Sequence, residues 1–93
     1  MAHIASPEEN EALLKRVRRI AGQIGALERA IEGQAECSDI LHLAAAARGA
    51  MNGLLDEVLE AHLREHVAKP GLSDKARKHG AEEIMQAIKR YAK

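Results

Sequence analysis

The chain has 93 residues, lacks Trp and Phe, and carries no formal net charge. A chain of this length has little capacity to bury a core by itself, and its composition, rich in Ala and Leu, is typical of helices packed on helices. No apolar run is long enough to span a bilayer, and the N-terminus has neither the basic start nor the apolar region of a secretory signal. We therefore expect a cytoplasmic protein without a membrane span, with residues 1–93 as one domain and residues 1–6 as a flexible N-terminal segment.

The first predicted helix starts at Pro7. Ser6 suits the N-cap, Pro7 suits the first helical position, and Glu9 stands where a capping box has its acid. Apolar residues then recur every three or four positions, which predicts an amphipathic helix that stops at Gly33. These apolar residues are Leu13, Val17, Ile20, Ile24, Leu27 and Ile31.

The same helix carries a short basic cluster, KRVRR at residues 15–19, in which four of five side chains are basic. Such a cluster is typical of a solvated helix face, but it also suits a stripe that binds the phosphates of nucleic acid. The residues alone leave both interpretations open.

A second helix is predicted from about Cys37 to Lys69, before Pro70-Gly71, and a shorter third helix is capped by Ser73-Asp74. Gly80 weakens the first half of the third helix. Two long amphipathic helices leave an apolar side uncovered, and a bundle needs about four helices around its core. A second copy supplies the missing pair, so we expect an all-α, three-helix protomer that forms an antiparallel four-helix-bundle dimer.

Cys37 and the two histidines of HLREH, His62 and His66, are candidate metal ligands. The histidines are four residues apart and share one face of a helix. Cys37 lies near the other end of the same predicted helix, roughly 37 Å away at the α-helical rise. Within one chain the thiol and the imidazoles therefore cannot hold the same ion unless that helix breaks.

An antiparallel dimer brings the three side chains together. When two copies of the second helix cross antiparallel, a residue of one copy meets a residue of the other if the average of their two residue numbers equals the number of the residue at the crossing point. That average is 49.5 for Cys37 and His62, and 51.5 for Cys37 and His66. The run Ala44 to Gly53 around this point is rich in small residues, which permit close backbone approach. Each dimer is thus expected to hold two sites for nickel, cobalt, zinc or copper. The alternative is that Cys37 is inert and both histidines are solvated.

Two further features bear on this site. Removal of Met1 leaves the amine of Ala2, which forms a compact nitrogen chelate with His3. H-x-x-E-H is also the spacing of an inverted zinc-peptidase motif, but that chemistry needs a third protein ligand and a cleft, for which a small helical bundle has little room. We expect no enzymatic activity, and we interpret His42 and His79 as surface residues.

Four segments resemble the CsoR/RcnR/FrmR family of bacterial transcriptional repressors: RVRRIAGQIGALERAIEG, AEC, ARGAMNGLLDEVLEAHLREHV and IKRYAK. The resemblance extends from about Pro7 to Lys93. It implies a helical disc built as a dimer of dimers, which binds double-stranded operator DNA and releases it when an effector binds. It also implies that Arg16, Arg19 and Arg48 contact DNA, with Lys15 and Arg18 beside them.

The resemblance leaves the effector open between two branches. Nickel/cobalt sensors carry Cys, His and His at positions that match Cys37, His62 and His66, and they also begin with a histidine at residue 3. Here the N-terminus, counted back from GQ, is two residues longer. Copper sensors have a second cysteine where His66 stands, and persulfide sensors also need two cysteines, so neither effector is favoured.

Formaldehyde sensors form the other branch, in which a methylene joins the N-terminal amine to the cysteine that matches Cys37. The stretches PEE, ALER and EGQAEC resemble that branch, whose members usually have Pro after Met1, whereas Ala2 here has a primary amine. The third metal position of that branch is typically not histidine, so His66 favours a metal. We therefore expect a repressor released by nickel or cobalt, with zinc also accommodated and no catalytic cofactor. Formaldehyde acting on Ala2 and Cys37 is the alternative.

Overall fold

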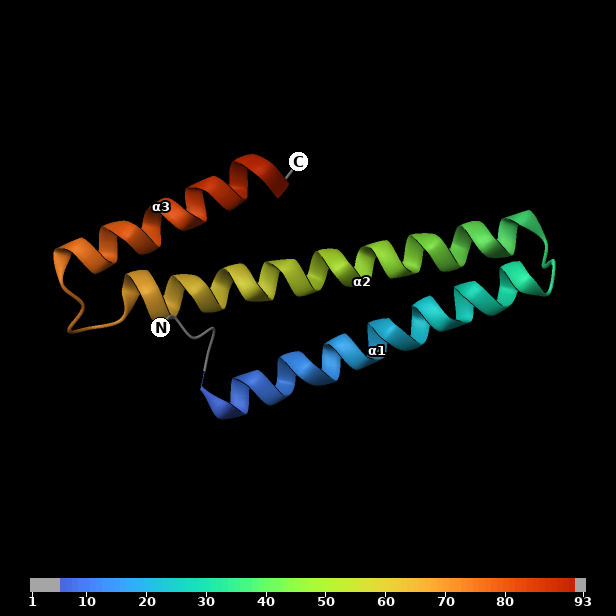
Figure 1. Ribbon diagram of the computed structural model, residues 1–93, viewed down its shortest axis with the longest axis horizontal. Coiled ribbons are helices and arrows are strands. Elements are labelled where there is room, and N and C mark those ends of the chain that lie inside the picture. The colour runs from blue at the N-terminus through green and yellow to red at the C-terminus, as the bar shows by residue number, and fades with distance from the viewer. Residues whose placement is uncertain (1–5, 92–93) are drawn as a thin grey trace. The chain divides into compact units, whose positions relative to one another are not determined.

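The structure is a computed structural model that describes residues 6–91. Its elements are α1 (Pro7–Glu32), α2 (Cys37–Leu63), the π-helical turn η1 (Arg64–Ala68) and α3 (Asp74–Tyr91), which follow one another along the ribbon of Figure 1. The described range contains no strand, so the prediction of an all-α chain with three helices is confirmed. None of the helices in this range is both long and apolar enough to cross a membrane.

The two predicted caps are present. The Ser6 hydroxyl accepts a hydrogen bond from the backbone N–H of Glu9 at 3.2 Å, and the Ser73 hydroxyl accepts one from Ala76 at 3.1 Å. Each bond satisfies one of the backbone donors that the first turn of a helix leaves without an intrahelical partner. α1 and α3 therefore start where the sequence predicted.

The end of α1 differs in one detail from the prediction. The helix ends at Glu32, next to Gly33, but the residue in the left-handed conformation is Gln34, with φ 55°. The N–H of Gln34 bonds to the carbonyl of Ile31 at 3.1 Å, and the N–H of Ala35 bonds to that of Ala30 at 2.9 Å. This is a Schellman motif, which usually places glycine at the position that Gln34 occupies.

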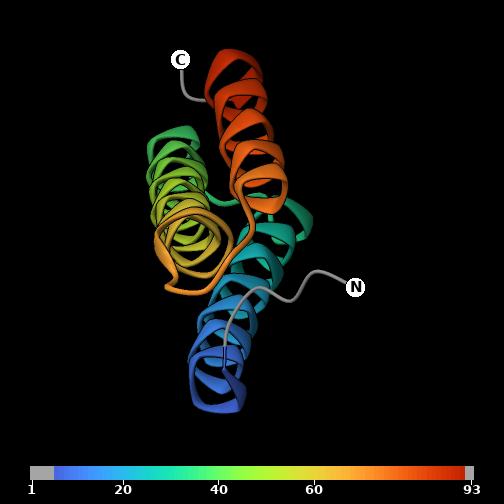
Figure 2. The ribbon, with the colours of Figure 1, turned by 90° about the vertical axis from the view of Figure 1, so that its left-hand side faces the viewer.

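Residues 11–56 form one compact unit, in which α1 and the first part of α2 run antiparallel as a hairpin (Figures 1 and 2). Its buried apolar residues are Ile20 and Ala47, each 5% exposed. Gly53 lies so close to Arg16 that a Cβ there would stand 2.9 Å from the Arg16 guanidinium. The absence of a side chain at Gly53 thus leaves room for the guanidinium of Arg16.

Residues 6–10 and 57–91 form a second compact unit. The predicted second helix extends as far as the sequence indicated, but its last turn, η1, is π-helical. The loop that follows contains Gly71 in the left-handed region, with φ 88°, and Arg77 of α3 donates to the carbonyls of Val67 and Leu72 on either side of it. In this unit Ala61 is 2% exposed and Gly80 of α3 is buried.

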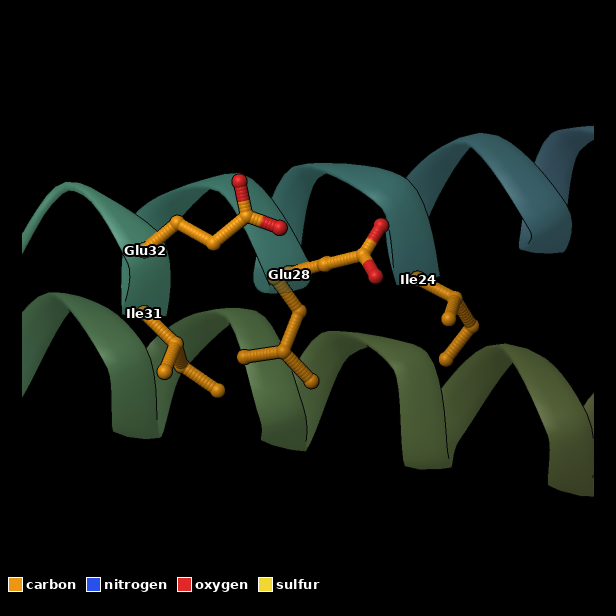
Figure 3. Close-up of a pocket in the computed structure, with 5 residues that line it drawn as sticks. Ile24, Glu28, Ile31 and Glu32 are labelled. Atoms are coloured by element: carbon orange, nitrogen blue, oxygen red, sulfur yellow. The ribbon is translucent and has the colours of Figure 1, made fainter.

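Large apolar side chains remain exposed along all three helices of the single chain. Ten of them have exposed fractions between 44% and 64%. On α1, Ile24, Leu27 and Ile31 line a shallow hollow with Glu28 and Glu32, and Figure 3 shows Ile24 and Ile31 pointing to the same side of the helix. The exposed set is Leu14, Val17, Ile24, Ile31, Leu41, Met51, Leu63, Met85, Ile88 and Tyr91.

Gln34 and Gly71, whose backbones are in the left-handed conformation, allow the two turns to be tested by mutation. A side chain in the left-handed region costs roughly 1 kcal/mol, so we expect Gln34→Gly to raise the free energy of unfolding by about that amount. Gly71→Ala should lower it by a similar amount, because it adds a Cβ at a positive φ. Chemical denaturation at one fixed protein concentration measures both changes, since any association between chains would also contribute to stability. A less stable Gln34→Gly protein would contradict the turn described here.

Candidate functional site

His62 and His66 lie together at the end of the second helix, as their spacing predicted. His62 is the last residue but one of α2, and His66 belongs to η1. Their ring centroids are 4.6 Å apart, and the rings are inclined by 50°. The His62 side chain is 23% exposed, and its Nε2 atom is buried without a hydrogen bond. This pair therefore offers two imidazoles at one place.

Glu83 of α3 faces the same pair. Its Oε1 atom lies 3.4 Å from Nε2 of His62 and 3.6 Å from Nε2 of His79. His79 is exposed, as predicted, but it does have a partner on its own helix. The spacing of His79 and Glu83 could have indicated that pairing. Nothing in the sequence places Glu83 beside His62, because the two residues belong to different helices.

The acid inside the HLREH motif has an ordinary role in this structure. Glu65 is partly buried and pairs through Oε2 with Nζ of Lys69 at 3.4 Å, one turn along the chain. Arg64, the first residue of η1, pairs with Glu9 at 3.1 Å and so joins the first turn of α1 to this segment. Sequence reasoning missed this contact between residues 55 positions apart.

Cys37 is the first residue of α2, and its thiol is free and exposed. Among residues 6–91 of the single chain, no three Cys, His, Asp or Glu side chains gather in a way that could hold a metal ion. The structure thus brings His62 and His66 together but does not complete a site around them. Ala2 and His3, the other predicted contributors, lie outside the described residues.

The histidine pair still fits a metal in one respect. A histidine that binds a metal through one ring nitrogen usually donates the N–H of its other nitrogen to a carboxylate. Oε1 of Glu83 lies 3.4 Å from Nε2 of His62 without a hydrogen bond between them, so a small approach would make this pairing and leave Nδ1 as the atom that would bind. The chemistry and the placement of these side chains therefore suit part of a metal centre.

The basic residues predicted to contact DNA all belong to the unit formed by residues 11–56. Lys15, Arg18, Arg19 and Arg48 are exposed, and Arg18 pairs with Glu11 at 3.5 Å. Arg16 is half-buried, with its guanidinium close to Gly53 of α2. Four of the five cations are thus accessible in the single chain, and the fifth packs across the hairpin.

Comparison with known proteins gives consistent results. The sequence profile of a family described as metal-sensitive transcriptional repressors matches residues 9–90. An uncharacterised protein encoded in the bioA 5′ region of Serratia marcescens is 47% identical over 85 residues, which are 91% of this chain and 93% of the relative. The transcriptional repressor RcnR of Salmonella arizonae is 34% identical over 85 residues, with the same two coverages.

Two solved structures are similar to the whole fold. A glutamate-to-histidine variant of the formaldehyde-responsive regulator FrmR from Salmonella enterica serovar Typhimurium has a TM-score of 0.87 and 43% identity, covering 92% of this chain and 97% of that one. The copper-sensing repressor CsoR with Cu(I) from Geobacillus thermodenitrificans has a TM-score of 0.85 and 31% identity, covering 100% and 95%. The protein therefore belongs to the CsoR/RcnR/FrmR family of metal-sensitive transcriptional repressors.

Proposed function

We propose that the protein represses transcription by binding operator DNA and that nickel or cobalt releases it. The observation that carries the metal proposal is the pair His62 and His66, whose rings are 4.6 Å apart beside the carboxylate of Glu83. Members of the family are repressors, and we propose no catalytic activity for this chain.

The proposed site is shared between chains. Cys37 begins α2 and the two histidines lie at its other end, and no third ligand joins them within the described part of one chain. An antiparallel pair of α2 helices that crosses within Ala44 to Gly53 would bring Cys37 of one chain to His62 and His66 of the other. The exposed apolar side chains supply the driving force for such a pairing, because burying them removes apolar surface from water.

The ligand set favours borderline metals. One thiolate and two imidazoles suit nickel, cobalt or zinc, whereas copper(I) prefers more than the one thiolate this chain can supply. His3 and the amine of Ala2 are proposed as further ligands. When bound, the metal would hold the ends of two chains at fixed positions. Glu83 would accept the N–H of His62 and so orient its ring, and Cys37 would lose its thiol proton.

DNA binding is assigned to Lys15, Arg16, Arg18, Arg19 and Arg48. Their cations would contact the phosphates of the DNA backbone. Each chain would carry one such row of cations, and the assembly of chains would set the distance between the rows of neighbouring chains. If metal binding changes how the chains pack, these rows of cations would no longer match the spacing of the DNA phosphates. A coupling free energy of about 1–3 kcal/mol is enough for such an effect.

A formaldehyde sensor is the second candidate, and it is favoured by the exposed thiol of Cys37 and by the likeness to a formaldehyde-responsive regulator. In this reaction the amine of Ala2 and the thiol of Cys37 add to one formaldehyde. The product is an N–CH2–S bridge, and the carbonyl oxygen leaves as water together with one proton from each group. His62 and His66 would take no part in the chemistry.

The DNA assignment predicts that Arg19→Glu combined with Arg48→Glu weakens operator binding by at least about tenfold and lowers the salt dependence of binding. Both side chains are exposed, so the fold should tolerate the change. The control is Lys75→Glu with Lys78→Glu, which changes the net charge equally on α3. Fluorescence anisotropy with labelled operator, repeated at several salt concentrations, measures both effects. If both double variants lost the same operator affinity, the effect would come from net charge alone and the assignment of Arg19 and Arg48 would be wrong.

The metal assignment predicts that nickel or cobalt releases the wild-type protein from DNA and fails to release His66→Ala and Cys37→Ala. His42→Ala, which removes an exposed histidine of α2, should respond like the wild type. The same anisotropy assay, with nickel, cobalt, zinc, copper(I) and formaldehyde added in turn, tests this. Full release of His66→Ala by nickel or cobalt would remove His66 from the site.

The formaldehyde alternative predicts a different pattern. Treatment should add the mass of one carbon atom per bridge, and Cys37→Ala should not gain it. Release from DNA should follow the mass change and persist in His66→Ala. Intact-mass spectrometry and anisotropy on the same samples decide the matter, since addition of mass without release would exclude this trigger.

A further inference from the structure

Gly80 of α3 lies directly against the backbone of His66. It is buried, and a Cβ built on it would stand 2.1 Å from the carbonyl oxygen of His66 and 2.8 Å from the carbonyl carbon. The same Cβ would also come within 2.9 Å of the His66 Cβ. At this point α3 can approach η1 only because residue 80 has no side chain.

A second contact holds the same two elements together. Arg77, one turn before Gly80, donates through Nη1 to the carbonyl of Val67, the residue after His66. The last carbonyls of a helix have no intrahelical partner, so this side chain satisfies one of them. Its other guanidinium nitrogen lies 3.5 Å from the carbonyl of Leu72 in the loop. Two neighbouring peptide groups of η1 thus meet α3 through Gly80 and Arg77.

We propose that Gly80 is a positioning residue for His66: the close approach of α3 that it permits sets where His66 stands relative to His62, and so tunes the metal site. This inference rests on the proposed function, in which both histidines are ligands. The sequence indicated only that Gly80 weakens the third helix, whereas in this proposal it helps to position a metal ligand.

The size of the expected displacement supports a functional effect. The group that a Cβ would meet is a backbone carbonyl, which cannot rotate aside as the end of a flexible side chain can. An ordinary carbon–oxygen contact is about 3.3 Å, so α3 and η1 would have to separate by roughly 1 Å. Ligand geometry must hold to within about 0.5 Å for a site to work well. If η1 takes up most of that separation, even the single methyl of alanine displaces His66 by more than this tolerance.

The test compares Gly80→Ala with Gly22→Ala. Gly22 is an exposed helical glycine at which a Cβ would meet nothing within 4 Å, so it controls for the change in helix propensity. In metal-free protein, the NMR signals of the His66 imidazole should shift in Gly80→Ala and stay in place in Gly22→Ala. Cobalt affinity, followed by optical absorption, should fall by about 10- to 100-fold in Gly80→Ala only. Unmoved His66 signals together with wild-type cobalt binding would overturn the inference.

A measurement on the wild-type protein covers the case in which Gly80→Ala does not fold. Hydrogen exchange with and without cobalt should show added protection in η1 and, together with it, in the α3 turn around Gly80. Protection confined to η1, with α3 unchanged, would contradict the inference. The proposed function fails on a different result, namely wild-type protein that binds neither cobalt nor nickel.

Discussion

The single chain cannot bury its own large apolar side chains, and the proposed assembly and shared site both depend on this constraint. In the described part of the chain only Ile20, Ala47 and Ala61 are buried apolar residues, whereas ten large apolar side chains stay largely exposed. Burial stabilises by about 25 cal/mol per Å² of apolar surface, so contact with a second copy is the direct way to stabilise such a chain. If two chains associate through these exposed side chains, parts of one site can lie on different chains, as we propose.

The candidate site has this divided character. α2 carries a free thiol at its first residue and His62 near its last, and the imidazole of His66 in η1 lies beside that of His62. The second unit supplies the support, because α3 presents the carboxylate of Glu83 to His62 and the bare backbone of Gly80 to His66. The cations assigned to DNA stand in the other unit, among residues 11–56. In our proposal, effector sensing and DNA binding therefore use different parts of the chain, and the assembly of several chains would connect them.

Much of the fold could be predicted from the sequence, because caps and apolar periodicity are local signals. Ser6 and Ser73 cap the helices as predicted, and the spacing of His62 and His66 correctly placed them together. The contacts that α3 makes with η1 could not be predicted, since no periodicity reports which helix packs on which. Gly80 is the clearest case: its propensity suggested a weak helix, and its packing against His66 explains why glycine stands there. The shared ligand set and the DNA contacts stay predictions, because both depend on neighbouring chains.

In the proposed site, one chain supplies the thiol and another supplies the imidazoles. Mixed oligomers test it most directly: a Cys37→Ala chain is combined with a chain that carries His62→Ala and His66→Ala. Neither variant alone should bind cobalt with the absorption of a thiolate-coordinated ion. The mixture should regain it, because a dimer of unlike chains assembles one intact site from the thiol of one chain and the imidazoles of the other. If properly folded mixed dimers regain no binding, the shared site is contradicted.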